Sequence, residues 1–399
     1  MSTTFEPGAQ PPEGFIPLAV PEIRGNEWKY IKECLDTGWV SSGGSFVDRF
    51  ERELAQHVGA NYAVAAVNGT AALHIALLIA GVEPDDEVLI PALTFIAPAN
   101  AIRYAGAWPV FIDVEPDYWQ MDPQKVAEFL DLECRWINRE LRNKATGRRV
   151  KAILPVDILG HPVNADDIMQ AARKYELVVV EDATESLGAK YKDRSVGCLA
   201  DVGCFSFNGN KIITTGGGGM IVTDNEAWAA RARHLTTQAK QDPVEYVHDE
   251  IGYNYRLGNI QAAMGCAQLE NLESFICAKR KIANAYQEAL RNIAGIIPMG
   301  EAPWAYSIHW MYTVLVDESS YGLSSRGLLK WLEKEKIQTR PLWQPLHQSK
   351  VYSSSQAYKV GIADFLHKHA LSLPCSAGLS NSELKRVVEA VQAAPESKT

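Results

Sequence analysis

The chain has 399 residues, 47% of them hydrophobic, and a formal net charge of −9. This length and apolar content suit one large α/β domain with a smaller one attached, and they argue against disorder. The acidic balance argues against nucleic acid or an anionic membrane as a partner.

The N-terminal stretch MSTTFEPGAQPPEG has neither a basic start nor an apolar run, so we expect an arm over residues 1–25 and no signal peptide. The chain has no uninterrupted run of 18 apolar residues, so we expect no membrane span. Its seven cysteines are scattered, without a C-x-x-C pair. This usage indicates reduced thiols in a cytoplasmic protein and provides no metal-ligand spacing.

From residue 62 onward, short β-branched runs alternate with helical patterns. These runs are continuously apolar, which is typical of strands buried on both faces. They predict an α/β fold with a mostly parallel sheet covered by helices. The predicted strands are 62–67, 87–91, 108–114, 150–158, 176–183 and 203–207.

One charged stretch, 131–150, interrupts the alternation and is mostly compatible with helix. It is either a solvated excursion on the surface or a docking surface. Beyond residue 255 a long helical pattern is followed by alternating strands such as 309–316. We therefore predict a large domain over 26–255 and a smaller C-terminal α/β domain over 256–399.

Polar residues follow the predicted strands, at the edge where an open parallel sheet binds ligands. Asn68 can cap the helix after the first strand, which leaves the N–H groups of Gly69 and Thr70 at a positively polarised helix end. By itself this motif is equally an ordinary helix cap. Asp182 ends a later strand, where it either caps a loop or faces a protonated ring nitrogen.

Lys211 stands in FSFNGNKIITTGGGGM, residues 205–220. A nucleotide phosphate loop needs Ser or Thr after the lysine, and Ile212 occupies that position. A lone lysine is usually a surface residue. Here Asp201 is the only charged residue among the ten before it, which favours a desolvated lysine able to form a Schiff base. The four glycines are either a plain turn or a close approach of the chain to a ligand.

An anion cradle, an acid, a lysine and the aromatic Phe95 together are the protein groups that pyridoxal phosphate requires. At these residues the chain resembles the DegT/StrS family of nucleotide-sugar aminotransferases, which have the fold-type I aminotransferase fold. The resemblance covers nearly the whole chain. Its sharpest motifs are GWVSSGGSFVDRFE (38–51), NGTAALHIAL (68–77), IPALTFIAPANAI (90–102), EDATESLGA (181–189), CFSFNGNKIITTGGGGMIVTD (204–224) and GYNYRL (252–257).

The resemblance implies that Lys211 binds pyridoxal phosphate covalently and shuttles a proton, while Asp182 pairs with the pyridine nitrogen. It also implies a homodimer with shared active sites, because one cofactor contact crosses to the neighbouring subunit. The other implied contacts are a phosphate site of Gly69, Thr70 and Ser206, Phe95 on the ring, Glu185 near the phenolic oxygen, and Asn254 on the partner's cofactor phosphate.

A lysine at position 211, where some family members have histidine, implies transamination and not dehydration. The motifs look most like enzymes that aminate C4 of a 4-keto-6-deoxy-2-acetamido sugar nucleotide in bacillosamine- and legionaminic-acid-type pathways, with L-glutamate as donor. The alternatives are another keto sugar, such as a perosamine-type GDP-sugar or a C3 keto sugar, and a non-catalytic sensor.

The substrate would occupy a cleft at the subunit interface. Asp157, where relatives often have histidine, leaves the finer substrate contacts open. Residue types do not determine the nucleotide base or whether the new amine is axial or equatorial. The predicted walls of this cleft are His309 and the stretches WVSSGG (39–44) and TRPLWQPLH (339–347). The predicted substrate residues are Trp39, Ser42, His309, Arg340 and His347.

Overall fold

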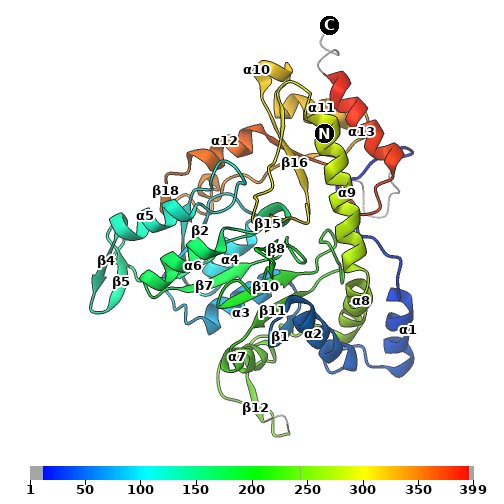
Figure 1. Ribbon diagram of the computed structural model, residues 1–399. Helices are drawn as coiled ribbons and strands as arrows, with labels where there is room; N and C mark the ends of the chain where they lie inside the picture. Colours follow the sequence, from blue (N-terminus) through cyan, green and yellow to red (C-terminus); the bar gives the residue numbers. More distant parts are fainter. Residues whose placement is uncertain (1–11, 243, 395–399) are drawn as a thin grey trace.

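The computed structural model describes residues 12–242 and 244–394 (Figure 1). Residues 1–11 of the predicted arm lie outside this range. No helix in the described part of the chain is long and apolar enough to cross a membrane. All seven cysteines are free thiols, as their scattered positions predicted.

An eight-stranded sheet forms the centre of the molecule, and every strand in it runs the same way except β11. Apart from the short edge strand β18, its strands are buried almost throughout, which explains why their sequences are continuously apolar. In spatial order they are β1 (Tyr62–Ala66), β11 (Gly219–Thr223), β10 (Val202–Ser206), β7 (Val178–Asp182), β6 (Val150–Ile153), β2 (Glu87–Pro91), β3 (Trp108–Ile112) and β18 (Ala357–Tyr358).

Helices cover this sheet, and α3 packs against β10 and β11. Further helices follow the strands along the chain, as the alternating pattern predicted. They are α1 (Glu27–Thr37), α2 (Ser45–Val58), α3 (Gly69–Ile79), α4 (Ala97–Tyr104), α5 (Pro123–Glu133), α6 (Ala165–Lys174), α7 (Glu226–Thr236) and α8 (Asn259–Leu269), with the short 3-10 turn η1 (Ile158–Gly160).

A smaller antiparallel sheet is formed by strands that follow the long helix α9 (Leu272–Leu290) in the chain (Figure 1). Its order is β14 (Ile296–Pro298), β16 (Tyr312–Val316), β19 (Ala370–Leu373) and β17 (Arg340–Pro341). The accompanying helices are α10 (Glu318–Tyr321), α11 (Ser325–Lys334), α12 (Gly361–His369) and α13 (Asn381–Ala393), with the 3-10 turn η2 (Leu346–Gln348).

The smaller sheet has its own hydrophobic cluster, made of Ile16 and residues from Ile282 onward. The α8 helix packs instead against α1 and α2, beside the large sheet. The two parts are also tied together by β18, a C-terminal strand that pairs in parallel with β3. The domain boundary at residue 256 stays a prediction.

The charged stretch 131–150 is not mainly helical, which corrects the expectation from sequence. After α5 it forms the hairpin β4 (Cys134–Ile137) and β5 (Glu140–Asn143). Asn138 and Arg139 join these strands with φ of 51° and 65°, and a two-residue turn with left-handed backbone matches the twist of a hairpin. Two other small pairings are β12 (Lys240–Asp242) with β13 (Val247–His248), and β15 (Ala305–Tyr306) with β8 (Lys190–Tyr191) and β9 (Arg194–Ser195).

Candidate active site

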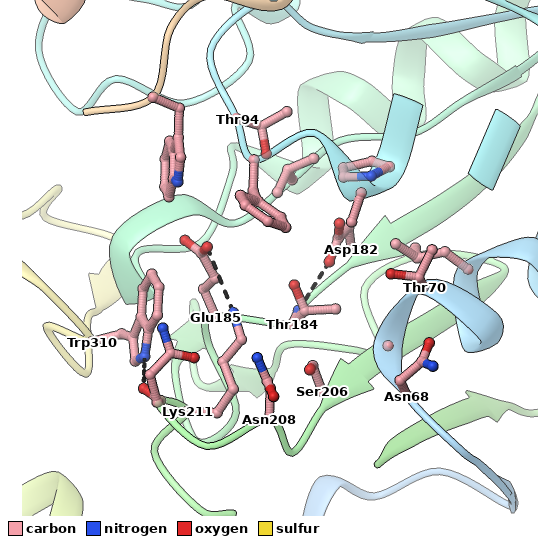
Figure 2. A pocket seen from close by; sticks show the side chains of 18 residues that line it. Asn68, Thr70, Thr94, Asp182, Thr184, Glu185, Ser206, Asn208, Lys211 and Trp310 are labelled. Carbon is pink, nitrogen blue, oxygen red and sulfur yellow. Dashed lines mark hydrogen bonds and ion pairs between the residues drawn. The ribbon is translucent and has the colours of Figure 1, made fainter. Parts of the chain in front are cut away.

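A cavity of about 310 Å³ opens beside the carboxyl ends of β1, β2, β7 and β10 (Figure 2). In the large sheet Asp182 pairs with Cys204 across β7 and β10, so the ends of these two strands lie together. The predicted residues that line the cavity are Gly69, Thr70, Phe95, Asp182, Glu185, Ser206 and Lys211. The sheet therefore gathers side chains from four separate sequence motifs.

The first residues of α3 form one end of the cavity. Asn68 caps this helix, because its side chain accepts the N–H of Ala71 at 2.8 Å. The N–H groups of Gly69 and Thr70 precede the first hydrogen-bonded turn, where a helix favours an anion. A Cβ on Gly69 would lie 2.8 Å from the Cβ of Ser206. Only a glycine lets the helix start and this serine approach closely enough to share a ligand.

The last two of the four glycines make a close approach and are not a plain turn. A Cβ on Gly219 would lie 2.5 Å from the backbone oxygen of Asn68 and 2.9 Å from the nitrogen of Gly69. A Cβ on Gly218 would lie 2.4 Å from Oγ1 of Thr215. β11 therefore packs directly against the start of α3, where it supports the backbone that carries the N–H groups of Gly69 and Thr70.

Asp182 occupies the buried end of β7, where its side chain accepts the N–H of Thr184 at 3.0 Å. Burial raises the pKa of this carboxyl group, against the opposing effects of the Thr184 hydrogen bonds and the Lys211 charge. A cationic ring nitrogen beside it would stabilise the carboxylate. The residue therefore fits the role of partner to a protonated pyridine.

Lys211 points across the cavity toward Glu185, with Nζ 3.7 Å from Oε1 (Figure 2). Burial raises the pKa of Glu185 to about 7, although the positive charge of Lys211 acts in the opposite direction. The other oxygen of Glu185 accepts the N–H of Leu159 at 3.0 Å, from a turn in which Leu159 has φ of 61°. Trp310 closes this side, its ring centroid 4.3 Å from the lysine nitrogen.

These residues fit pyridoxal phosphate. The helix start and Ser206 suit its phosphate, Asp182 its ring nitrogen, and Lys211 its aldehyde. Phe95 lines the same cavity with 53% of its surface exposed. An aromatic ring left uncovered inside a cavity suits a flat partner such as the cofactor ring.

Other predicted site residues lie outside this cavity lining. Asn254 is exposed and forms an isolated β-bridge with Thr237. Trp39 and Ser42 are exposed between α1 and α2. The predicted roles of the residues outside the lining stay predictions, and these residues are Asn254, Trp39, Ser42, His309, Arg340 and His347.

Three of them have other contacts in the structure. Arg340 lines a separate hollow of the small domain beside Phe15. His347 is 3.0 Å from Asp364. Burial lowers the pKa of His309 to about 4, so this side chain is neutral at pH 7.

The sequence interpretation did not identify several residues that the structure brings to the cavity. Thr184, Asn208 and Asn210 neighbour motif residues and could have been included as part of the same loops. Trp310 comes from the C-terminal part, and no motif marks it. Trp343 lies within the predicted cleft wall 339–347 but was not itself named as a site residue. Asp157 lies outside the lining, where its carboxyl group accepts the N–H of Val163 at 2.8 Å.

Comparisons with protein families, with curated proteins and with solved structures each find proteins similar to this chain. The model of the DegT/DnrJ/EryC1/StrS aminotransferase family matches residues 21–392. The GDP-perosamine synthase of Caulobacter vibrioides (strain ATCC 19089 / CIP 103742 / CB 15) is 38% identical over 379 residues, covering 94% of this chain and 97% of that protein. The GDP-perosamine synthase of Escherichia coli O157:H7 is 37% identical over 377 residues, covering 94% and 98%. The crystal structure of aminotransferase TlmJ from Streptoalloteichus hindustanus has a TM-score of 0.86 and 27% identity, covering 96% of this chain and 99% of that one.

Proposed function

The chain belongs to the DegT/DnrJ/EryC1/StrS aminotransferase family and is a pyridoxal-phosphate-dependent sugar aminotransferase with the fold-type I architecture. From this premise we propose that it transfers the amino group of L-glutamate to a 4-keto-6-deoxy hexose carried on a nucleoside diphosphate. The observation that carries the proposal is the meeting of Lys211, Asp182 and the start of α3 in one cavity. A sensor without turnover has no need of this lysine.

Pyridoxal phosphate, when bound, supplies the electron sink that lets the carbon bearing the amino group lose a proton. The chain's own groups would hold and orient it. The N–H groups of Gly69 and Thr70, with the hydroxyl of Ser206, would hold the phosphate, and Phe95 would cover the ring. Asp182 would keep the proton on the pyridine nitrogen.

Lys211 would then move a proton at its Nζ. Once it is no longer joined to the cofactor, the structure provides a place for its ammonium group between Glu185 and Trp310. A buried carboxyl group with a pKa of about 7 can accept or return a proton near neutral pH. Glu185 is therefore suited to hold the charge of the released lysine and to let it become neutral again.

The choice of sugar differs from the main expectation from sequence. Relatedness to two GDP-perosamine synthases favours the alternative, a perosamine-type GDP-sugar, over a 2-acetamido sugar of the bacillosamine type. GDP-4-keto-6-deoxymannose is therefore the first substrate to test. The product would be an amino sugar nucleotide of the kind that polysaccharide biosynthesis consumes.

The homodimer belongs to the same proposal and is supported by the surface next to the site. His74 on α3 is 97% buried, yet neither ring nitrogen has a hydrogen-bond partner. Its ring meets the rings of Tyr253 and Tyr104 edge-on, and Tyr104 is 58% exposed. Asn254, next to Tyr253, is also exposed, so a second copy that covers this surface would receive Asn254 and bury the aromatic rings.

The proposed function can be tested in two half-reactions. The purified protein would be converted to the pyridoxamine form with L-glutamate and then mixed with GDP-, UDP- and dTDP-linked 4-keto-6-deoxy sugars. We expect return of the aldehyde-form absorbance and a GDP-linked amino sugar, identified by mass spectrometry and NMR. Failure of every keto sugar nucleotide to restore the aldehyde form would contradict the proposal.

A further inference from the structure

Two tryptophans from the C-terminal part of the chain line the same cavity as Lys211. Trp310 precedes β16, and Trp343 follows β17. The two indole rings differ in how much of their surface, and whether their N–H group, is already in contact with other residues. This difference points to a substrate contact at Trp343, within the stretch 339–347 that the sequence predicted as a cleft wall.

Trp310 is already engaged. Its indole N–H donates to the backbone oxygen of Asn210 at 2.8 Å, and Lys211 lies over its ring (Figure 2). Only 4% of its surface is exposed. Trp310 therefore contacts Lys211 and has little exposed surface on which a substrate could pack.

Trp343 is held in place but keeps unused surface. Its neighbours Leu342 and Leu346 are both buried in the large core, and the N–H of Leu346 donates to the oxygen of Ala92 at 2.8 Å. Trp343 itself is half-buried. Within the described residues its indole N–H has no hydrogen-bond partner, and no aromatic ring or cation stacks on it. Trp343 packs partly against the large core, and the rest of its side chain lines the cavity with an unused indole N–H.

The charges of the cavity indicate what this side chain would bind. Lys211 is the only cation in the described lining, and Asp182 and Glu185 are the only acids. All three are assigned to the cofactor and the proton transfer. The remaining wall near Trp343 is uncharged, which suits a neutral ring and not a carboxylate.

We propose that Trp343 forms the subsite for the hexose ring, an inference that rests on the proposed function. The C–H face of the sugar packs on the indole, and the indole N–H donates to a sugar hydroxyl. Hexoses combine an apolar face with hydroxyl groups at the rim, which matches a tryptophan with a free ring and a free donor. Glutamate has no such face, so Trp343 distinguishes the acceptor from the donor.

The test compares matched pairs of ligands on the pyridoxamine-form enzyme by calorimetry. The pairs are GDP with GDP-mannose, UDP with UDP-glucose, and dTDP with dTDP-glucose. In wild-type protein we expect the hexose to tighten binding in at least one pair. Trp343→Leu should weaken that hexose nucleotide about fivefold to tenfold and leave the nucleoside diphosphate unchanged. Trp343→Phe, which keeps the ring without the N–H, should lose less.

Trp136→Leu is the matched control, because Trp136 is 47% exposed on the β4–β5 hairpin and lies outside the cavity lining. The glutamate half-reaction should keep its rate in Trp136→Leu. A hexose contribution that survives in Trp343→Leu, or that is absent in wild-type protein, overturns the inference. Equal loss for the nucleoside diphosphate also overturns it, because Trp343 would then contact the nucleotide. Wild-type protein that binds the hexose nucleotides but aminates no keto sugar contradicts the proposed function and leaves this subsite intact.

Discussion

The side-chain nitrogen of Lys211 lies 3.7 Å from a carboxylate oxygen of Glu185, with only 12% and 5% of the two side chains exposed. The two groups are electrostatically coupled, because the positive charge of Lys211 lowers the pKa of Glu185 while the larger effect of burial raises it to about 7. The same pair faces the cavity that would receive the cofactor (Figure 2).

Replacing Lys211 should abolish turnover. Lys211→Ala removes the only amine in the described lining that can bind the cofactor covalently, and we expect kcat/KM to fall at least about a thousandfold. Borohydride reduction followed by peptide mass spectrometry should label Lys211 in wild-type protein and no lysine in the variant. Lys190→Ala, an exposed lysine on β8, is the control. A labelled and active Lys211→Ala would refute the assignment.

Glu185→Gln should stabilise the cofactor-free protein, and increasingly so as the pH rises. The pKa of Glu185 is raised from 4.5 to about 7, so between these values the unfolded chain has released a proton that the folded chain retains. Folding stability therefore falls over this window and is constant above it. Urea unfolding should show no difference between the proteins near pH 4.5 and about 3 kcal/mol in favour of the variant above pH 7. A difference independent of pH would show that Glu185 does not titrate in this window.

Asp182→Asn should slow both half-reactions while leaving the fold intact. Asparagine keeps the size of the side chain and can still accept the Thr184 N–H, but it cannot keep a proton on the pyridine nitrogen. We expect a loss of roughly 3–5 kcal/mol in transition-state stabilisation. Stopped-flow absorbance would measure it, with thermal unfolding as the check on folding. Unchanged half-reaction rates would exclude this role for Asp182.

Gly219→Ala should weaken cofactor binding, whereas Gly217→Ala should not. The added methyl group at Gly219 would press on the backbone that begins α3, while the nearest atoms to a Cβ at Gly217 are 3.8 Å away. Overpacking of this kind costs about 1–3 kcal/mol. Titration of the cofactor-free proteins with pyridoxal phosphate, followed by absorbance, would compare the two. Equal affinities would mean that the cradle does not need this close approach.

Mixing two inactive variants should restore activity if the sites are shared. In a dimer of Lys211→Ala with Asn254→Ala, one site receives both lesions and the other receives none. Random pairing gives about half mixed dimers, so roughly a quarter of wild-type activity should return. Co-expression with two different affinity tags would isolate the mixed dimers. If Asn254 acts within its own subunit, every site is damaged and purified mixed dimers stay inactive.

The sequence by itself determined six of the eight strands of the main sheet, and it did not predict β11 or β18. It also pointed to residues that the structure brings into one cavity, although their roles stay predictions. Continuous apolar runs identified β2 and β7, because strands buried on both faces leave that signature in local composition. Asp182 and Lys211 could be placed together because the carboxyl ends of parallel strands share one edge. The hairpin after α5 was missed, since its charged residues are compatible with helix and its turn depends on the left-handed backbone of Asn138 and Arg139.

Tertiary structure alone decided which residues face the cavity from the other side. Trp310 lies just before β16 and Trp343 just after β17. Nothing in the local sequence shows that either ring lines the same cavity as Lys211. Both line the cavity that contains Lys211, and Trp343 does so on a segment that Leu342 and Leu346 anchor on the large core. Local patterns record what a strand or helix buries, whereas a cavity between two packed parts depends on contacts between residues far apart in the chain.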